Sequence, residues 1–305
     1  MAKRRKKKGE NKFIRLILII ITVIGGFYLS EIDGTYSLNN TQETFSDISS
    51  DLVVSYLDVG QADAILVQNN GEAMLIDAGN NEDGELLVEY FRKNGVSSFK
   101  YLVGTHPHED HIGGLDDIIN NFSIDTIYLP DVITTTKTFT EVLDAIENKN
   151  KTYEIPKIGE EFYLGEARGV VIYTGNDDND LNNSSIVLRL SFGNTSFLFT
   201  GDMEKKIEKK ILDKDIQADV LKVGHHGSNT SSTEGFLNQT SPEISIISVG
   251  EGNSYELPKD KIIKRLEKIG TTIYRTDRDG TIQIVSDGKT NEVIKIDISF
   301  DSSQI

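Results

Sequence analysis

All five histidines of the 305-residue chain lie in two short segments, and these are the residues whose types and spacing could do chemistry. The first segment, residues 105–114, reads THPHEDHIGG, and the second, residues 224–228, reads GHHGS. Each segment directly follows an apolar stretch typical of a β-strand. Imidazole and carboxylate ligands suit zinc, manganese or iron. The clustering therefore predicts a metal site, and scattered structural histidines would not be distributed in this way.

The first segment has the pattern H-x-H-x-D-H. His106 and His108 are two residues apart in a loop, so one loop can direct both at one ion. Asp110 and His111 begin the next turn and can hold a second ion a few ångströms away. The glycines at 113–114 let the backbone pack closely under the loop. A solvent-exposed polar loop is the alternative, and it poorly explains three histidines and an aspartate within six residues.

The second segment supplies His225 and His226. Because adjacent side chains usually diverge, we expect one of them to bind metal and the other to contact substrate or transfer protons. Which of them binds the metal stays open, with His226 the expected ligand. A surface loop without function is the alternative. Asp202, at the end of the apolar stretch SFLFTGD, is the candidate to bridge two ions. Glu204 is a candidate substrate contact, although acids at such positions are most often solvated residues of a first helical turn.

The composition narrows the chemistry further. The chain has no cysteine, which excludes disulfides, a cysteine nucleophile, zinc fingers and cysteine-ligated iron–sulfur clusters. The net charge of −16 divides unevenly, because the first 30 residues carry eight basic side chains and one acid, and the other 275 carry 24 basic and 47 acidic groups. The body, at −23, is a poor general surface for nucleic acid.

The N-terminal residues divide into three parts. Residues 1–12 form a basic tail, residues 13–29 an apolar stretch, and residues 30–50 a polar linker rich in Ser, Thr and Asn. Seventeen apolar residues are at the short end of the length that spans a bilayer, and the basic cluster predicts that the N-terminus stays in the cytoplasm. We therefore expect a single-pass anchor in the cell membrane, with the body outside the cytoplasm. A cleaved signal peptide, which would make the protein secreted, is the weaker alternative because no small-x-small site follows the apolar run.

From residue 51 onward, strand-like and helix-like segments alternate in one domain, residues 51–305. The pattern includes a helix over residues 112–121 and a final pair of strands, residues 272–274 with 281–285. Many strands, interspersed helices and few prolines predict a layered α/β sandwich.

With these segments in place, the chain resembles the metallo-β-lactamase superfamily, and more narrowly the hydrolase domain of ComEC-type competence proteins and their stand-alone relatives. The segments that carry the resemblance are YLDVGQADAI at 56–65, LIDAG at 75–79, THPHEDHIGG at 105–114, NNSSIVL at 182–188, TGD at 200–202, LKVGHHGS at 221–228, SVGEGNSYELP at 248–258 and TDRDGT at 276–281. The resemblance implies an αββα sandwich, a two-metal site at the edge where the sheets meet, and hydrolysis by a metal-bound hydroxide.

The resemblance also implies roles for individual residues. His106 and His108 hold one ion, Asp110 and His111 hold the other, Asp202 bridges them, and one of the pair His225 and His226 completes the site. Asp110 orients the hydroxide, and the other member of the pair is a candidate acid or phosphate contact. Asp77 supports the histidine loop from beneath, and Asn183 and Ser185 occupy the positions of an Asn/Ser run expected near substrate; turn capping is their alternative role.

Two departures from the family pattern bear on activity. The chain has no histidine between His111 and His225, where many members have one, so we expect the first ion to be weakly held or exchangeable. Leu257 stands where the subfamily tends to have a histidine, and leucine can neither bind metal nor donate a proton.

The main hypothesis is a membrane-anchored metal-dependent hydrolase acting on phosphodiester bonds, in nucleic acid or a phosphorylated surface component. Two divalent ions, zinc in preference to manganese, are the expected cofactors, and no nucleotide cofactor is expected. DNA stays open as a substrate but is disfavoured by the charge of the body. The alternatives are a catalytically weakened binding or scaffold protein, for which Leu257 is the support, and a cytoplasmic DNA-binding protein that uses the basic tail.

Overall fold

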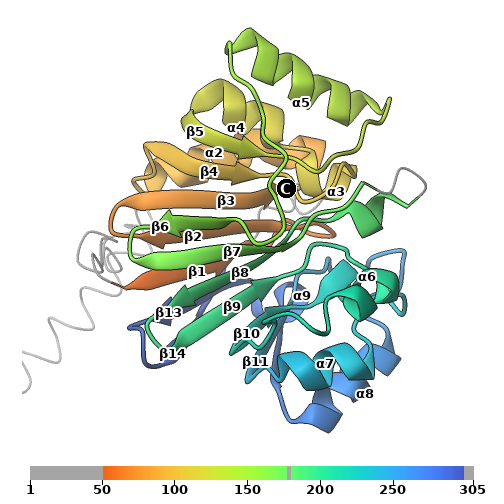
Figure 1. The fold of residues 1–305 in the computed structure, drawn as a ribbon. Coiled ribbons are helices and arrows are strands. Elements are labelled where there is room, and N and C mark those ends of the chain that lie inside the picture. Colours follow the sequence, from red (N-terminus) through yellow and green to blue (C-terminus); the bar gives the residue numbers. More distant parts are fainter. Residues whose placement is uncertain (1–50, 177–179, 299–305) are drawn as a thin grey trace, which may run out of the picture. The chain divides into compact units, whose positions relative to one another are not determined.

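The computed structural model describes residues 51–176 and 180–298. Within these residues two seven-stranded sheets face each other, and helices cover both outer faces (Figure 1). The architecture is therefore a layered α/β sandwich, as the sequence pattern predicts, with the αββα order that the resemblance implies.

The strands of the first sheet follow the order β14-β13-β1-β2-β3-β4-β5. Their bounds, in that order, are Asn291–Ile296, Thr281–Ser286, Leu52–Tyr56, Ala64–Asn69, Glu72–Ala78, Ser98–Val103 and Ser123–Tyr128. β3, β4 and β5 run parallel, and the other neighbours pair antiparallel.

The strands of the second sheet follow the order β12-β11-β10-β9-β8-β7-β6. Their bounds, in that order, are Thr272–Arg275, Ile244–Ile247, Val220–Lys222, Thr195–Phe199, Val187–Phe192, Ala167–Tyr173 and Glu161–Leu164. β9 to β12 run parallel, and β6 to β9 pair antiparallel.

Successive side chains of a strand point to opposite faces, and this period of two divides the core into layers. In β3, Met74 and Ile76 point between the sheets, whereas Leu75 points to the outer helices. In β9, Phe197 likewise points between the sheets, and Leu198 points to the outer helices of the second sheet. Each sheet is therefore apolar on both faces, which explains why its strands read as nearly continuous apolar runs.

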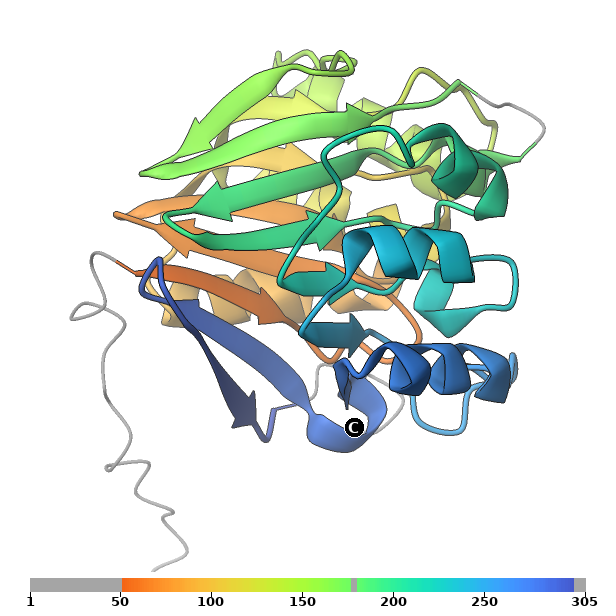
Figure 2. The ribbon, with the colours of Figure 1, turned by 60° about the horizontal axis from the view of Figure 1, so that its bottom comes forward.

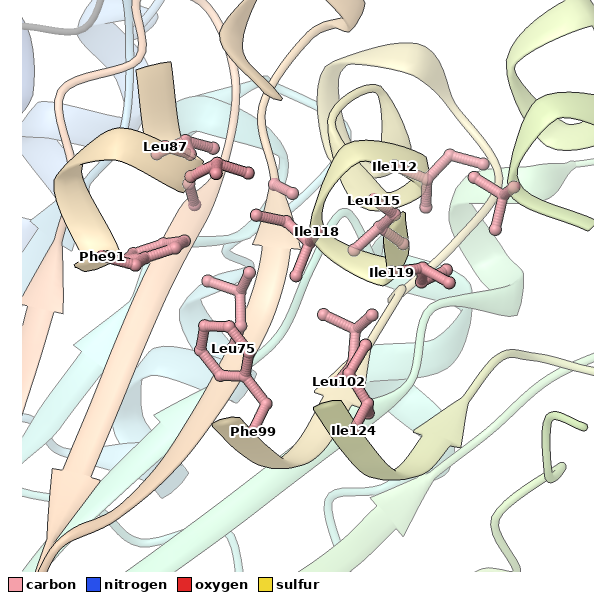
Figure 3. Packing of buried hydrophobic residues seen from close by; sticks show 14 of the residues in the cluster. Leu75, Leu87, Phe91, Phe99, Leu102, Ile112, Leu115, Ile118, Ile119 and Ile124 are labelled. Atoms are coloured by element: carbon pink, nitrogen blue, oxygen red, sulfur yellow. The ribbon is translucent and has the colours of Figure 1, made fainter. Parts of the chain in front are cut away.

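The helices of the first sheet are α2, Gly84–Lys93, α4, Leu115–Asn121, and α5, Lys137–Asn148. Leu87 and Phe91 of α2 lie one turn apart and pack toward Leu75 and Phe99 of the sheet (Figure 3). The helices of the second sheet are α6, Lys205–Lys210, α7, Glu234–Thr240, and α8, Asp260–Ile269, which lie on its outer face (Figure 2).

Two sequence predictions are wrong in detail. The helix predicted over residues 112–121 is two helices, α3, Glu109–Ile112, and α4, because the glycines at 113–114 press against neighbouring backbone and interrupt it. The predicted final strand pair does not exist, because β12 joins β11 and β13 joins β1 and β14 in the other sheet. The short helix α9, Thr276–Asp279, and Gly280 at φ 66° carry the chain between the sheets. Three further elements, β6, β14 and α7, were not predicted from the sequence.

The predicted anchor, residues 13–29, the tail and the linker lie outside the described residues. Across the two described ranges, no helix has the length and apolar character needed to span a bilayer.

Candidate metal centre

The predicted site residues gather at one edge of the sandwich, where loops follow the carboxyl ends of strands from both sheets. β3 ends beside Asp77, and the loop after β4 leads into the first histidine segment. In the second sheet, β9 leads to Asp202, and β10 leads to His225 and His226. A hydrogen bond from the Ile186 amide to the Thr105 carbonyl, at 2.9 Å, joins the sheets at this edge.

Asp77 holds the first histidine segment in place. One of its carboxylate oxygens accepts a hydrogen bond from the Thr105 amide at 2.7 Å, and the other accepts one from the Thr105 hydroxyl at 2.8 Å. His111 Nδ1 lies 2.7 Å from the same carboxylate. Burial raises the pKa of Asp77 above its ordinary value, despite the opposing effect of His111. The structure thus places Asp77 where the resemblance implies a supporting residue.

Asp202 is central to the site, and its two carboxylate oxygens face different partners. Oδ1 lies 3.3 Å from His111 Nε2 and 3.7 Å from His226 Nε2. We call this the Oδ1 side; it also includes Asp110, whose carboxylate is 3.3 Å from His226 Nε2. Oδ2 lies 4.0 Å from His106 Nε2 and 3.6 Å from His225 Nε2.

The residues near Oδ2 form a second group, which also includes His108. We call this group the Oδ2 side. His108 Nδ1 lies 3.0 Å from His106 Nε2. Donor atoms held by one tetrahedral ion at 2.0–2.1 Å would be roughly 3.3 Å apart, so the spacings of 3.3–3.9 Å on the Oδ1 side fit metal binding. On the Oδ2 side, the pair His106 and His108 is close enough to share an ion. The structure therefore brings all five histidines, Asp110 and Asp202 together.

Several atoms at the centre of this cluster are buried without a hydrogen-bond partner among the described residues. They are His111 Nε2, His226 Nε2 and Asp202 Oδ1. Buried polar atoms are nearly always satisfied, and a cation on the Oδ1 side would satisfy these three. Ligand atoms of Asp110, His111, Asp202 and His226 all lie within 4.8 Å of one another. The donor set thus fits a divalent ion.

The electrostatics of the cluster reflect the same crowding. Burial by itself raises the pKa of Asp202, but the imidazoles around it, His111 first, hold the pKa well below its ordinary value. Burial by itself lowers the pKa of His111, but the surrounding carboxylates, Asp202 first, hold the pKa well above its ordinary value. A positive charge at the centre of the cluster is therefore strongly favoured, whether it is carried by a proton or by a metal ion.

The histidine pair departs from the expectation that adjacent side chains diverge. Both residues have left-handed backbone conformations, with φ 52° at His225 and φ 50° at His226. Their rings are tilted by 72° with centroids 6.3 Å apart, and both Nε2 atoms face Asp202. His226 is buried, so it cannot contact substrate, whereas the His225 side chain is 24% exposed.

Two predicted substrate contacts are corrected by their burial. Asn183 accepts a hydrogen bond from the Glu204 amide at 3.3 Å, and Ser185 accepts one from the Asp202 amide at 3.1 Å. Both are at most 1% exposed, so they position Asp202 and Glu204 and do not meet substrate. Glu204 itself lies against the site, with Oε1 3.5 Å from His225 Nδ1.

Leu257 has a structural role in the packing of its loop. It lies against the hydrophobic cluster beneath the second sheet, and the Asn253 side chain holds both its amide and its carbonyl. The next residue, Pro258, closes over Gly227, where an added Cβ would lie 2.5 Å from the proline ring. This loop therefore supports the turn that carries the histidine pair.

Sequence reasoning missed Asp63 and Lys222, a buried ion pair beneath the Oδ1 side. Lys222 Nζ lies 2.8 Å from Asp63 Oδ2, and both side chains are at most 1% exposed. Asp63 Oδ1 lies 3.5 Å from His226 Nδ1, and the Asp63 amide donates to the Asp110 carbonyl at 3.0 Å. The sequence did carry a signal for this pair, because each residue is a single charge within a mostly apolar segment: Lys222 in VLKV and Asp63 in QADAI.

Substitution of Gly113 tests how closely the first histidine segment packs against the backbone at Asn80. Its backbone is ordinary α-helical, but an added Cβ would lie 2.2 Å from the Asn80 carbonyl carbon. We expect Gly113→Ala to lower the free energy of unfolding by about 3 kcal/mol, because backbone cannot move aside as a side chain can. Urea denaturation measures it. Gly235→Ala is the control, since no atom lies within 4 Å of its Cβ; equal stabilities of the two variants would contradict the prediction.

Comparisons with known proteins agree with this geometry. The family model described as the metallo-beta-lactamase superfamily matches residues 57–251. The chain is 31% identical over 257 residues to ComE operon protein 3 of Bacillus subtilis. This match covers 77% of the chain and 33% of that protein. It is 29% identical over 238 residues to competence protein ComA of Neisseria gonorrhoeae, covering 77% of the chain and 32% of that protein. The chain thus spans about a third of the length of the curated relatives it matches.

Solved structures share the fold at low sequence identity. The diiron β-hydroxylase CmlA from Streptomyces venezuelae matches with a TM-score of 0.54 at 13% identity, over 81% of this chain and 54% of CmlA. The metallo-beta-lactamase fold protein YhfI from Bacillus subtilis matches with a TM-score of 0.50 at 12% identity, over 74% of this chain and 97% of YhfI. From the family match, the fold and the gathered ligand set, the chain belongs to the metallo-β-lactamase superfamily.

Proposed function

We propose that the protein is a metal-dependent phosphodiester hydrolase, held at the cell membrane by residues 13–29 with its body outside the cytoplasm. The observation that carries the hydrolase proposal is the Asp202 carboxylate, which faces one histidine-rich set with each oxygen. Two divalent ions, zinc or manganese, would supply an activated water and polarise the scissile bond when bound. His106 and His108 would serve one ion, Asp110, His111 and His226 the other, and Asp202 both.

The residues of the open rim suggest how substrate and water are handled. The Asp110 side chain is 33% exposed, whereas those of His111 and Asp202 are at most 3% exposed. Burial by itself raises the pKa of Asp110, but His111 and His226 hold it well below its ordinary value. Asp110 is therefore ionised at neutral pH and can orient a water molecule by accepting its hydrogen bond.

The preference for phosphodiesters rests on the relatives. Two of the curated proteins that match are named for competence or recombination: competence protein ComA, and recombination protein 2 of Haemophilus influenzae, to which the chain is 29% identical over 236 residues. The acidic body, at −23, disfavours a long polyanion away from the metal centre. A small or surface-linked phosphodiester is therefore the favoured substrate, with DNA second.

The test is turnover of a phosphodiester panel by the full-length chain with Mn²⁺ or Zn²⁺. The panel contains bis(p-nitrophenyl) phosphate, single-stranded DNA and double-stranded DNA. We expect hydrolysis of the small diester, and a loss of at least about 100-fold in kcat/KM for His108→Ala, because an ion that activates water loses a ligand. Turnover that His108→Ala leaves unchanged would contradict the proposal. DNA cleavage without turnover of the small diester would instead favour a nuclease.

A further inference from the structure

The charge of the body is distributed unevenly between the two helical layers of the sandwich. On the first sheet, α2, α4 and α5 carry three basic and seven acidic side chains. On the second sheet, α6, α7 and α8 carry eight basic and four acidic side chains, although the body as a whole is strongly acidic. We call the outward surface of α6, α7 and α8 the basic face.

The lysines of α6 form an exposed stripe on this face. Residues four apart lie on one side of a helix, which places Lys205 beside Lys209 and Lys206 beside Lys210, and all four are exposed. The single acid of this helix, Glu208, is buried. Like charges four residues apart destabilise a helix, so helix stability does not explain the stripe.

The charged groups that point inward join the three helices into one surface. Glu208 of α6 accepts hydrogen bonds from the amides of Ser232 and Thr233, the latter at 2.9 Å. Arg265 of α8 donates to the Ser232 carbonyl at 2.8 Å. Because Thr233 caps α7, one turn is held from both neighbouring helices. The exposed lysines of α6 and of α8, among them Lys261 and Lys264, are therefore held in fixed relation to one another.

The basic face adjoins the metal centre at the start of α6. Lys205 directly follows Glu204, whose Oε1 lies 3.5 Å from His225 Nδ1. The Lys205 amide donates to the Thr230 carbonyl at 2.9 Å, and the Thr230 hydroxyl lies 3.0 Å from the same His225 nitrogen. From there the face continues over α7 to α8 on the outer side of the sheet (Figure 2). A surface that binds this face therefore lies beside the metal centre.

We propose that the basic face docks the body on an anionic phospholipid bilayer, so that the metal centre meets phosphodiesters held at the membrane surface. The proposal rests on the proposed function for the anchor, residues 13–29. Residues 30–50 span at most about 75 Å even when fully extended, so an anchored body stays near the bilayer. Each lysine close to an anionic bilayer strengthens attachment roughly fivefold.

The acidic remainder of the body favours a bilayer over a soluble polyanion as the partner. The two sheets alone separate the helical layers by about 10 Å, which exceeds the Debye length of about 8 Å at physiological ionic strength. The acids of the first layer are therefore largely screened from a bilayer that meets the basic face. A soluble polyanion, in contrast, encounters every side of the acidic body as it diffuses.

Because the chain has no cysteine, a single attached fluorophore reports which face meets the membrane. Gln239→Cys places it on α7, between α6 and α8, and Asn148→Cys places it at the end of α5 on the other layer; both positions are exposed. The full-length chain is reconstituted in phosphatidylcholine vesicles that contain a headgroup-linked quencher, with or without phosphatidylglycerol. At low salt we expect phosphatidylglycerol to increase quenching at least about twofold for Gln239→Cys only, and high salt to remove the increase.

Matched lysine variants test the charge itself. Lys209→Gln with Lys264→Gln removes one lysine from each flanking helix, and we expect the ratio of docked to undocked body to fall about 10-fold or more. The control, Lys93→Gln with Lys137→Gln, removes the same charge from exposed positions of α2 and α5 and should keep the wild-type ratio. Equal quenching at the two labelled positions, or an increase that the first pair of substitutions leaves unchanged, would overturn the proposal.

Further outcomes separate docking from the proposed function. Flotation of the full-length chain with phosphatidylglycerol vesicles but not with pure phosphatidylcholine vesicles would contradict the anchor and support docking, whereas flotation with neither would overturn both. Binding of inorganic polyphosphate without any quenching that depends on phosphatidylglycerol would overturn docking in favour of a soluble polyanion. If the wild type does not hydrolyse bis(p-nitrophenyl) phosphate but shows the expected quenching, the hydrolase proposal fails and docking stands.

Discussion

Asp202→Asn should weaken the binding of divalent ions on both sides of the site, with apparent affinities at least about 100-fold lower than in the wild type. Replacement of residues that merely orient metal ligands already costs 10- to 100-fold in metal affinity, and Asp202 is proposed to be a ligand shared by both ions. Asparagine keeps the shape of the side chain but loses its negative charge, and its NH₂ group replaces one oxygen that could bind a cation. Bound metal per chain, measured by elemental analysis after gel filtration, is the readout.

The control for this prediction is Asp219→Asn, the same substitution at a residue that directly precedes β10. Asp219 accepts hydrogen bonds from the Ser196 amide at 2.7 Å and the Ser196 hydroxyl at 2.8 Å, so its replacement tests the loss of a structural carboxylate. We expect Asp219→Asn to retain the metal content of the wild type. Retention of both ions by Asp202→Asn would refute the bridging role.

The gathering of the ligands could be predicted because residue type carries most of that information. Histidines and aspartates at the ends of apolar strands are constrained by strand direction, and the carboxyl ends of parallel strands share an edge. The layers followed for the same reason, since the alternation of short apolar strands with amphipathic helices leaves few architectures.

The remaining features depend on information that lies outside local sequence. The rings of His225 and His226 both face Asp202 because the backbone of both residues is left-handed, and the pattern of side chains in the sequence does not predict such backbone angles. β14 was missed because it is an edge strand in which no residue is buried, so its apolar alternation is weak. Asn183 and Ser185 look like surface turn residues, and only the packing of η3, Leu181–Ser184, beneath Asp202 buries them.

Lys222→Met should lower the free energy of unfolding by about 3–5 kcal/mol, because it leaves the Asp63 carboxylate buried without its cation. That is a large part of the 5–15 kcal/mol by which domains are typically stable. The Lys222 ammonium has a second partner, the Val223 carbonyl at 3.2 Å, which loses its hydrogen bond as well. Urea denaturation in the presence of a chelator measures the effect, since bound metal would otherwise add its own binding free energy to the result.

The double variant Asp63→Asn with Lys222→Met separates charge from packing. If the cost comes from an uncompensated charge, the neutral double variant should recover most of the stability that Lys222→Met loses. Lys268→Met is the matched control, because Lys268 pairs with Glu234 at 3.4 Å with both side chains at least 60% exposed, and we expect its loss to cost less than about 1 kcal/mol. Equal losses from the two lysine variants would contradict a buried ion pair. Recovery of stability in the double variant without recovery of metal binding would show that Asp63, which contacts His226 and the Asp110 backbone, is kept charged for the site and not for the fold.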